Sequence, residues 1–280
     1  IGASPLALGQ SNAIEKSAYS RLLALFQQHG HAQVIATVEQ LPIQSPPSVT
    51  DLQSIYLGAE SYYAIGNYDR GKKYFEFWIA NSTGQTTLER LKPYCKLRLA
   101  QIHAKLNDTP AAISLLNELL KEDVDANVQN SARLQKAWLL AEANPNSTES
   151  LALCEQCLQA YAAGSHDYLS ALLLKSVLMQ QHGNLKEASA LLMEIRAASD
   201  ESKSMQELRY KASLLLLQVN QSLGDSSLNT SLVNELHQAT PPSQRLLELG
   251  KLEVLMAKPD NQLLDEDLME LELLGLKAND

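Results

Sequence analysis

The 280-residue chain has few of the residues that interrupt helices or build strands. It contains only 12 Gly and 10 Pro, and no stretch of useful length alternates apolar with polar residues. Turn residues and β-branched runs are needed for sheets and their connections, so their scarcity predicts an all-α protein. Hydrophobic residues make up 45% of the chain, which is enough to bury a sizeable core and argues against bulk disorder.

Basic charge and long apolar runs are also scarce. The net charge is -9 and the pI about 5.2, a balance that disfavours general nucleic-acid binding. No run of 18 or more apolar residues occurs, so we expect no membrane span.

The chain has only three cysteines, Cys95, Cys154 and Cys157. An odd and low count does not indicate a disulfide scaffold and favours a cytoplasmic location. The first ten residues are uncharged, small and apolar, and we expect residues 1–11 to be a flexible lead-in. Alternatively, residues 1–9 are the remnant of a secretory signal, because Ala7-Leu8-Gly9 has the small-x-small form of a cleavage site. The protein would then be secreted or periplasmic.

Motifs for catalysis or cofactor binding are missing from the sequence. There is no phosphate-binding glycine loop, nucleophile elbow or H-E-x-x-H pattern, so we expect no enzyme and no cofactor. Cys154 and Cys157 form a C-x-x-C within a helical pattern, whereas zinc would need two further ligands and a redox motif a strand before it. The two cysteines are interpreted as core residues, with a metal or redox module as the remote alternative.

Breaks in the helical pattern recur at intervals of 36 to 41 residues. Gly, Asn and Asp suit the left-handed turn that ends a helix. The breaks are Gly30, Gly66-Asn67, Asn107-Asp108, Asn144-Pro145, Gly183-Asn184 and Gly224-Asp225. A second set of breaks alternates with these and gives seven helix pairs, over 12–41, 49–82, 87–122, 126–163, 165–198, 201–239 and 242–279. A repeated helix pair indicates a helical solenoid, because single hairpins cannot bury their apolar faces.

Several helix starts can also be located. Pro93 indicates that a helix begins near Lys92 or kinks there, and Thr109 precedes Pro110 as a cap residue. Ser165, Asn184 and Asp200 are further cap candidates. We expect one solenoid domain over 12–280, with the acidic, leucine-rich segment 261–279 as its capping helix or, alternatively, as a partner-binding tail.

Three of the turns are flanked by the same residue types. Small residues lie seven positions before the turn residue, at Ala59, Ala100 and Ser176, and five after it, at Gly71, Ala112 and Ala188. Large apolar residues lie nine after it, at Phe75, Leu116 and Leu192. Small residues on both helices of a hairpin permit a close crossing, and a large side chain fills the neighbouring groove.

This pattern resembles the tetratricopeptide repeat, most strongly over residues 55–78 and more weakly over 96–119 and 172–195. The resemblance implies a right-handed α-solenoid of about seven antiparallel hairpins, although the period of this chain is longer than is usual for the family. It also implies that the first helices line a concave groove. The expected function is a scaffold or adaptor that binds a peptide or helix of another protein, as part of a larger complex. The alternative is a regulatory domain that senses a peptide or effector.

The charges divide unequally between the two kinds of helix. First helices with their caps carry 16 Lys/Arg and 12 Asp/Glu, while second helices and loops carry 7 and 20. The expected groove is therefore mildly basic and favours a partner with acidic or carboxylate groups, unless these charges serve only solubility.

The groove residues expected to contact a partner are Tyr56, Glu60, Tyr63, Tyr94, Arg98, Gln101 and Lys211. In some members of the family, Lys and Asn side chains of the first helices grip a terminal carboxylate. That clamp does not carry over, because Glu60, Gln101 and Val177 stand where its Asn would be. Tyr56, Glu60 and Tyr63 are expected to face the groove, so that replacing all three by Ala would leave folding largely intact.

Overall fold

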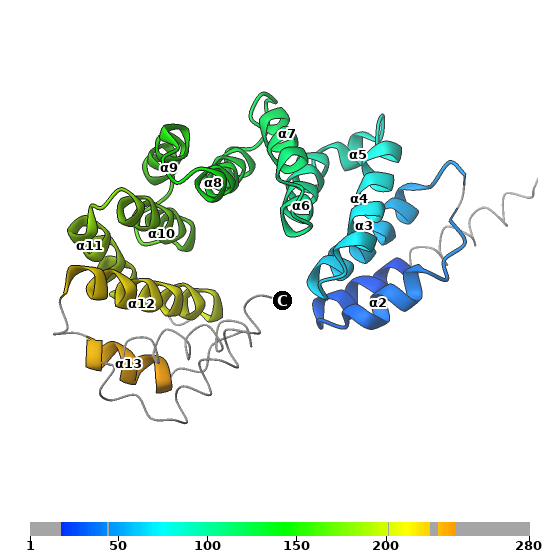
Figure 1. Ribbon diagram of the computed structural model, residues 1–280. Helices are drawn as coiled ribbons and strands as arrows, with labels where there is room; N and C mark the ends of the chain where they lie inside the picture. The colour runs from blue at the N-terminus through cyan, green and yellow to red at the C-terminus, as the bar shows by residue number, and fades with distance from the viewer. Residues whose placement is uncertain (1–17, 44, 201, 225–228, 239–280) are drawn as a thin grey trace, which may run out of the picture. The chain divides into compact units, whose positions relative to one another are not determined.

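The computed structural model describes residues 18–43, 45–200, 202–224 and 229–238, and every regular element in these ranges is a helix (Figure 1). The elements are α2 (His31–Val38), α3 (Val49–Ala64), α4 (Tyr68–Asn81), α5 (Thr86–Glu89), α6 (Lys92–Lys105), α7 (Thr109–Leu119), α8 (Ala126–Ala143), α9 (Thr148–Ala160), α10 (His166–Gln181), α11 (Leu185–Arg196), α12 (Lys203–Leu223) and α13 (Asn229–Gln238). Residues 18–27 are also helical. The predicted lead-in, the pair over 242–279 and the capping helix lie outside the described residues.

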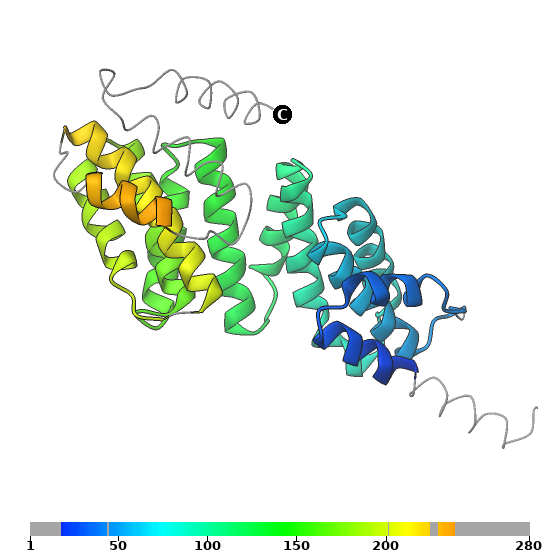
Figure 2. The ribbon, with the colours of Figure 1, turned by 90° about the horizontal axis from the view of Figure 1, so that it is seen from below.

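The helices form two compact units, Ile1–Leu139 and Leu140–Asp280. In the first unit, α3 packs against α2 and α4, and α6 packs against α4 and α7. In the second unit, α10 packs against α9, α11 and α12, and α12 packs against α11 and α13. The turned view in Figure 2 shows helices side by side within each unit. Contacts between neighbours in sequence confirm the predicted hairpin repeat, while the prediction of a single domain stays a prediction.

The turns between paired helices repeat one hydrogen-bond pattern. Gly66, Asn107 and Gly183 have φ angles of 78°, 60° and 78°, in the left-handed region. The backbone N–H that follows each of them donates to a carbonyl five residues back, with N···O distances of 2.9, 2.8 and 2.8 Å at Tyr62, His103 and Met179. This is the six-to-one bond of a Schellman turn. The three turns aligned in the sequence are therefore equivalent in the structure.

The aligned small and large positions form the hairpin cores. Ala59 and Gly71, Ala100 and Ala112, and Ser176 and Ala188 are all buried, and so are the three bulky partners Phe75, Leu116 and Leu192. Close approach of the backbones at the small pairs leaves room for one large side chain beside them. The predicted packing rule is confirmed in both units.

Gly71 tests this packing, because a Cβ atom there would lie 3.4 Å from Ile102 Cδ1 and 3.6 Å from Tyr62 Cβ. These are ordinary contacts, so Gly71→Ala should stabilise the fold by up to about 1 kcal/mol through a better helix propensity. Gly71→Leu should destabilise the fold by about 1–3 kcal/mol, because the space between Gly71, Ile102 and Tyr62 has no room for a branched side chain. Urea unfolding of both variants measures the difference, and equal stabilities would show that the helices do not cross closely here.

At three places the residue that ends or caps a helix differs from the predicted one. The left-handed residue of the first turn is His29, with φ 59°, and Gly30 instead precedes α2 as its N-cap. Asp108 rather than Thr109 caps α7, and Ser202 rather than Asp200 caps α12. Other predictions are confirmed: α6 begins at Lys92, and the Ser165 side chain caps α10 by accepting from Tyr168 N. No helix among the described residues is long and apolar enough to cross a membrane.

Candidate partner-binding site

Helices α3 and α6 of the first unit bring four of the predicted groove residues together around Arg98. The Arg98 guanidinium contacts the Glu60 carboxylate through two atom pairs, Nε with Oε1 and Nη2 with Oε2, each 3.1 Å apart. Its Nη1 donates to Gln101 Oε1 at 2.6 Å. Its Cζ lies 4.3 Å from the centroid of the Tyr63 ring, in cation–π geometry. We call Glu60, Tyr63, Arg98 and Gln101 the Arg98 cluster.

The Arg98 cluster is partly shielded from water but remains accessible. The exposed fraction is 13% for the Glu60 side chain and 32% for that of Arg98. Burial by itself lowers the pKa of Arg98, but the negative charge and hydrogen bonds of Glu60 outweigh it and raise that pKa. The two contacts to Glu60, the one to Gln101 and a hydrogen bond to Tyr63 use four of the five guanidinium N–H groups. One donor therefore remains for an acceptor on another molecule.

Tyr56 lies one helical turn before Glu60 on α3, but it belongs partly to the core. Its ring centroid is 6.3 Å from those of Phe75 and Trp78. Burial, followed by the charge of Glu60, raises the pKa of its hydroxyl. Replacing Tyr56 together with Glu60 and Tyr63 is now expected to destabilise the first unit, because the ring fills space beside Phe75. This corrects the expectation that all three side chains face only the groove.

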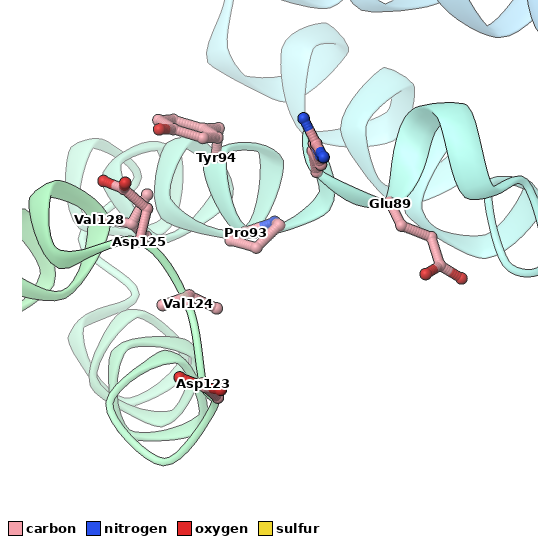
Figure 3. Close-up of a pocket in the computed structure, with 8 residues that line it drawn as sticks. Glu89, Pro93, Tyr94, Asp123, Val124, Asp125 and Val128 are labelled. Carbon is pink, nitrogen blue, oxygen red and sulfur yellow. The ribbon is translucent and has the colours of Figure 1, made fainter.

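Tyr94 is 44% exposed and borders a hollow of about 420 Å³ on the first unit. Figure 3 shows Tyr94 and Pro93 on α6, with Asp125 just before α8 and Val128 in its first turn across from them. The hollow is lined by Glu89, Arg90, Pro93, Tyr94, Asp123, Val124, Asp125 and Val128. It depends on the loop between α7 and α8, whose course the helical pattern did not indicate, and sequence reasoning therefore missed it.

Three of the basic residues expected in or near the groove form ion pairs with carboxylates. Lys96 Nζ pairs with Glu122 at 2.5 Å and with Glu118 at 3.8 Å, and its side chain is 17% exposed. Arg98 is likewise neutralised by Glu60. In the second unit, Lys211 Nζ pairs with Glu207 at 2.6 Å. Assigning charges helix by helix ignored the ion pairs that form within and between helices.

Cys154 and Cys157 are both buried free thiols on α9. The Cys154 Sγ donates to the carbonyl of Ala171 at 3.2 Å, and burial raises its pKa to about 12. Among the residues that the structure describes, no group of three or more His, Cys, Asp or Glu side chains could hold a metal ion. This environment is that of inert structural cysteines rather than of reactive ones.

The thiols should therefore react only when the protein unfolds. With a pKa of about 12 for Cys154, its thiolate fraction at pH 8 is about 10⁻⁴, because each pH unit below the pKa costs a factor of ten. An aromatic disulfide reagent at pH 8 should label all three cysteines in urea and almost none in buffer. Rapid labelling of the folded protein would revive the redox alternative.

The paired helices, their Schellman turns and their small-residue crossings define a tetratricopeptide-like helical repeat fold. The chain is similar in structure to BtubC (BKLC) from P. vanneervenii, with a TM-score of 0.56 at 13% identity over 85% of this chain and 95% of that one. It is also similar to the C-terminal part of a TPR repeat-containing protein from Cytophaga hutchinsonii, with a TM-score of 0.53 at 12% identity over 90% and 99% of the two chains.

A third solved structure is more distant. The TPR2AB domain of yeast Sti1, solved in a complex with pHSP90, has a TM-score of 0.35 at 10% identity over 96% of this chain and 100% of that one, so the likeness carries no inference about function. No protein-family model and no curated protein matches the sequence. The identities of these structures are low enough that they establish the fold alone.

Proposed function

We propose that the protein is a non-enzymatic interaction scaffold that binds an extended or helical segment of another protein in a groove lined by its first helices. The observation that supports this most directly is the Arg98 cluster. Four polar and aromatic side chains from α3 and α6 are fixed by mutual contacts, with the guanidinium held at 3.1 Å from Glu60 and 4.3 Å from the Tyr63 ring. Side chains that are ordered in advance lose little entropy when a partner binds.

The cluster also suggests which partner groups it would bind. The remaining Arg98 donor suits a carboxylate or amide oxygen, while the part of the Tyr63 ring that Arg98 does not cover offers aromatic surface to an apolar side chain. Since Glu60 already neutralises the guanidinium, an acidic group on the partner gains a hydrogen bond rather than the attraction of an unpaired charge. The preference for acidic groups is therefore proposed for this one contact and not for the whole groove.

Selection from a phage-displayed library of random 12-residue peptides tests the proposal with the full chain. We expect enriched peptides to bind the purified protein, and Gln101→Ala to weaken binding by roughly three- to tenfold, the effect of losing one hydrogen bond in a cluster. Gln156→Ala, an exposed glutamine of α9, is the matched control and should leave the affinity unchanged. Failure to enrich any peptide, or equal affinities for the two variants, would contradict the proposal.

A further inference from the structure

We infer that the hollow beside Tyr94 takes a lysine or arginine side chain of the same partner segment that contacts the Arg98 cluster. This inference rests on the proposed function and adds the chemistry of a second contact. It starts from the apolar part of the lining of the hollow, which is formed by Pro93, Val124 and Val128 together with the exposed ring of Tyr94. Lysine and arginine place an aliphatic stem on such a surface and keep the charged end in water.

The charges around the hollow select a cation rather than an apolar or acidic occupant. The lining contains three carboxylates, those of Glu89, Asp123 and Asp125, and one guanidinium, that of Arg90, so its net charge is negative. Within the described part of the chain, the side chains of Glu89 and Asp123 have no hydrogen-bond or ion-pair partner, and Asp125 Oδ1 accepts only from the backbone of Asn127, at 2.8 Å. These charges are therefore available for an incoming cation, in contrast to the Glu60 carboxylate, which is paired with Arg98.

Figure 3 indicates which carboxylates matter most. Asp123 and Asp125 lie with Val124 along the loop that leads into α8, on the side of Tyr94 and Pro93. The Glu89 side chain extends away from Pro93 in the same view. The exposed Tyr94 ring gives the cation a π face as well. We assign recognition of the cation to Asp123, Asp125 and Tyr94.

Tyr94 at the edge of the hollow and Arg98 in the cluster lie on one side of α6, which indicates a spacing for the partner residues. Tyr94 and Arg98 are four positions apart on α6, and residues with this spacing lie on the same side of a helix. The rise of about 1.5 Å per residue separates them by roughly 6 Å along the axis. An extended segment advances about 3.3 Å per residue. A partner segment that runs along α6 should therefore carry its cationic residue two positions from a residue with a carboxylate or amide oxygen.

The test uses the peptides selected from the random 12-residue library and the full chain. We expect enriched peptides to contain Lys or Arg two positions from Glu, Asp, Gln or Asn. Asp123→Asn together with Asp125→Asn should weaken their binding by about three- to tenfold at low salt, and less at high salt because exposed charges are screened. Glu142→Gln together with Glu155→Gln, two exposed carboxylates of α8 and α9, removes the same charge elsewhere and should change the affinity little.

Replacing the peptide lysine by norleucine gives the same comparison with an unaltered protein, in case the aspartate variant folds poorly. A loss of affinity with norleucine that matches the aspartate variant supports the inference. If Gln101→Ala weakens binding but neither the aspartate variant nor norleucine does, the cation site is wrong and the proposed function stands. If no peptide is enriched, or if the enriched peptides lack basic residues, the inference is overturned, and in the first case the proposed function fails with it.

Discussion

Replacing Phe75 by alanine is expected to lower the free energy of unfolding by about 3–5 kcal/mol, the usual cost of emptying a fully buried aromatic site. Phe75 of α4 has no exposed surface and packs in a cluster with Leu52 and Ala59 of α3 and Ile102 of α6. It is the large residue of the strongest repeat motif, next to the close crossing at Gly71. Few neighbours can move into the cavity, because the small residues around it already hold the backbones together.

Phe77→Ala on the same helix is the control for this prediction. Phe77 is 42% exposed, so its truncation should cost no more than about 1 kcal/mol. Urea unfolding followed by far-ultraviolet circular dichroism compares the two variants. Similar midpoints would mean that the face of α4 assigned to the core is incorrect, and with it the alignment of small and large residues on which the repeat rests.

Arg98→Ala is expected to have the next largest effect, on both stability and partner binding. Removal of the guanidinium leaves the Glu60 carboxylate, which is 13% exposed, without its ion-pair partner. It also removes the Nη1 donor that lies 2.6 Å from Gln101 Oε1. Breaking a buried pair costs about 3–5 kcal/mol, and the partial exposure of Arg98 reduces this to about 1–3 kcal/mol. Arg98→Lys should recover only part of the loss, because an ammonium cannot form the two parallel contacts.

A double-mutant cycle separates the loss of the pair from the loss of packing. Arg98→Ala combined with Glu60→Gln should be less destabilised than the sum of the single variants, since the stranded charge is removed. Arg90→Ala, an exposed arginine on the preceding turn, should alter stability by less than about 0.5 kcal/mol. Additive effects of the two cluster variants would show that Glu60 and Arg98 do not depend on each other in solution.

The hairpin register was predictable because its determinants are local. A left-handed residue between helices can be recognised as Gly or Asn, and the small residues at fixed distances from it follow from helix geometry. Phe75, Leu116 and Leu192 were placed correctly by counting from three turns. Helix starts were less certain, since Asp108 and Thr109 are both capping residues and the sequence alone does not decide which of them comes first in the helix.

The candidate site was only partly predictable. Glu60, Tyr63, Arg98 and Gln101 were placed on the groove side from their repeat positions, but the contact of one guanidinium with the other three side chains depends on how α6 lies against α3. Tyr56 was placed on that side as well, although its ring reaches back to Phe75. The pairing of Lys96 with Glu118 and Glu122 likewise required the position of α7. Sequence patterns locate residues on a helix face, whereas contacts between helices come from packing.

Hydrogen exchange of the backbone amides, measured by mass spectrometry with and without a selected peptide, tests the binding surface most directly. The account predicts slower exchange on peptide binding in Val49–Ala64 and Lys92–Lys105, the helices α3 and α6, because amides under a bound segment open less often. The second helices α4 (Tyr68–Asn81) and α7 (Thr109–Leu119) should change less. Protection confined to α4 and α7, or to the second unit, would contradict a partner-binding groove on the first helices.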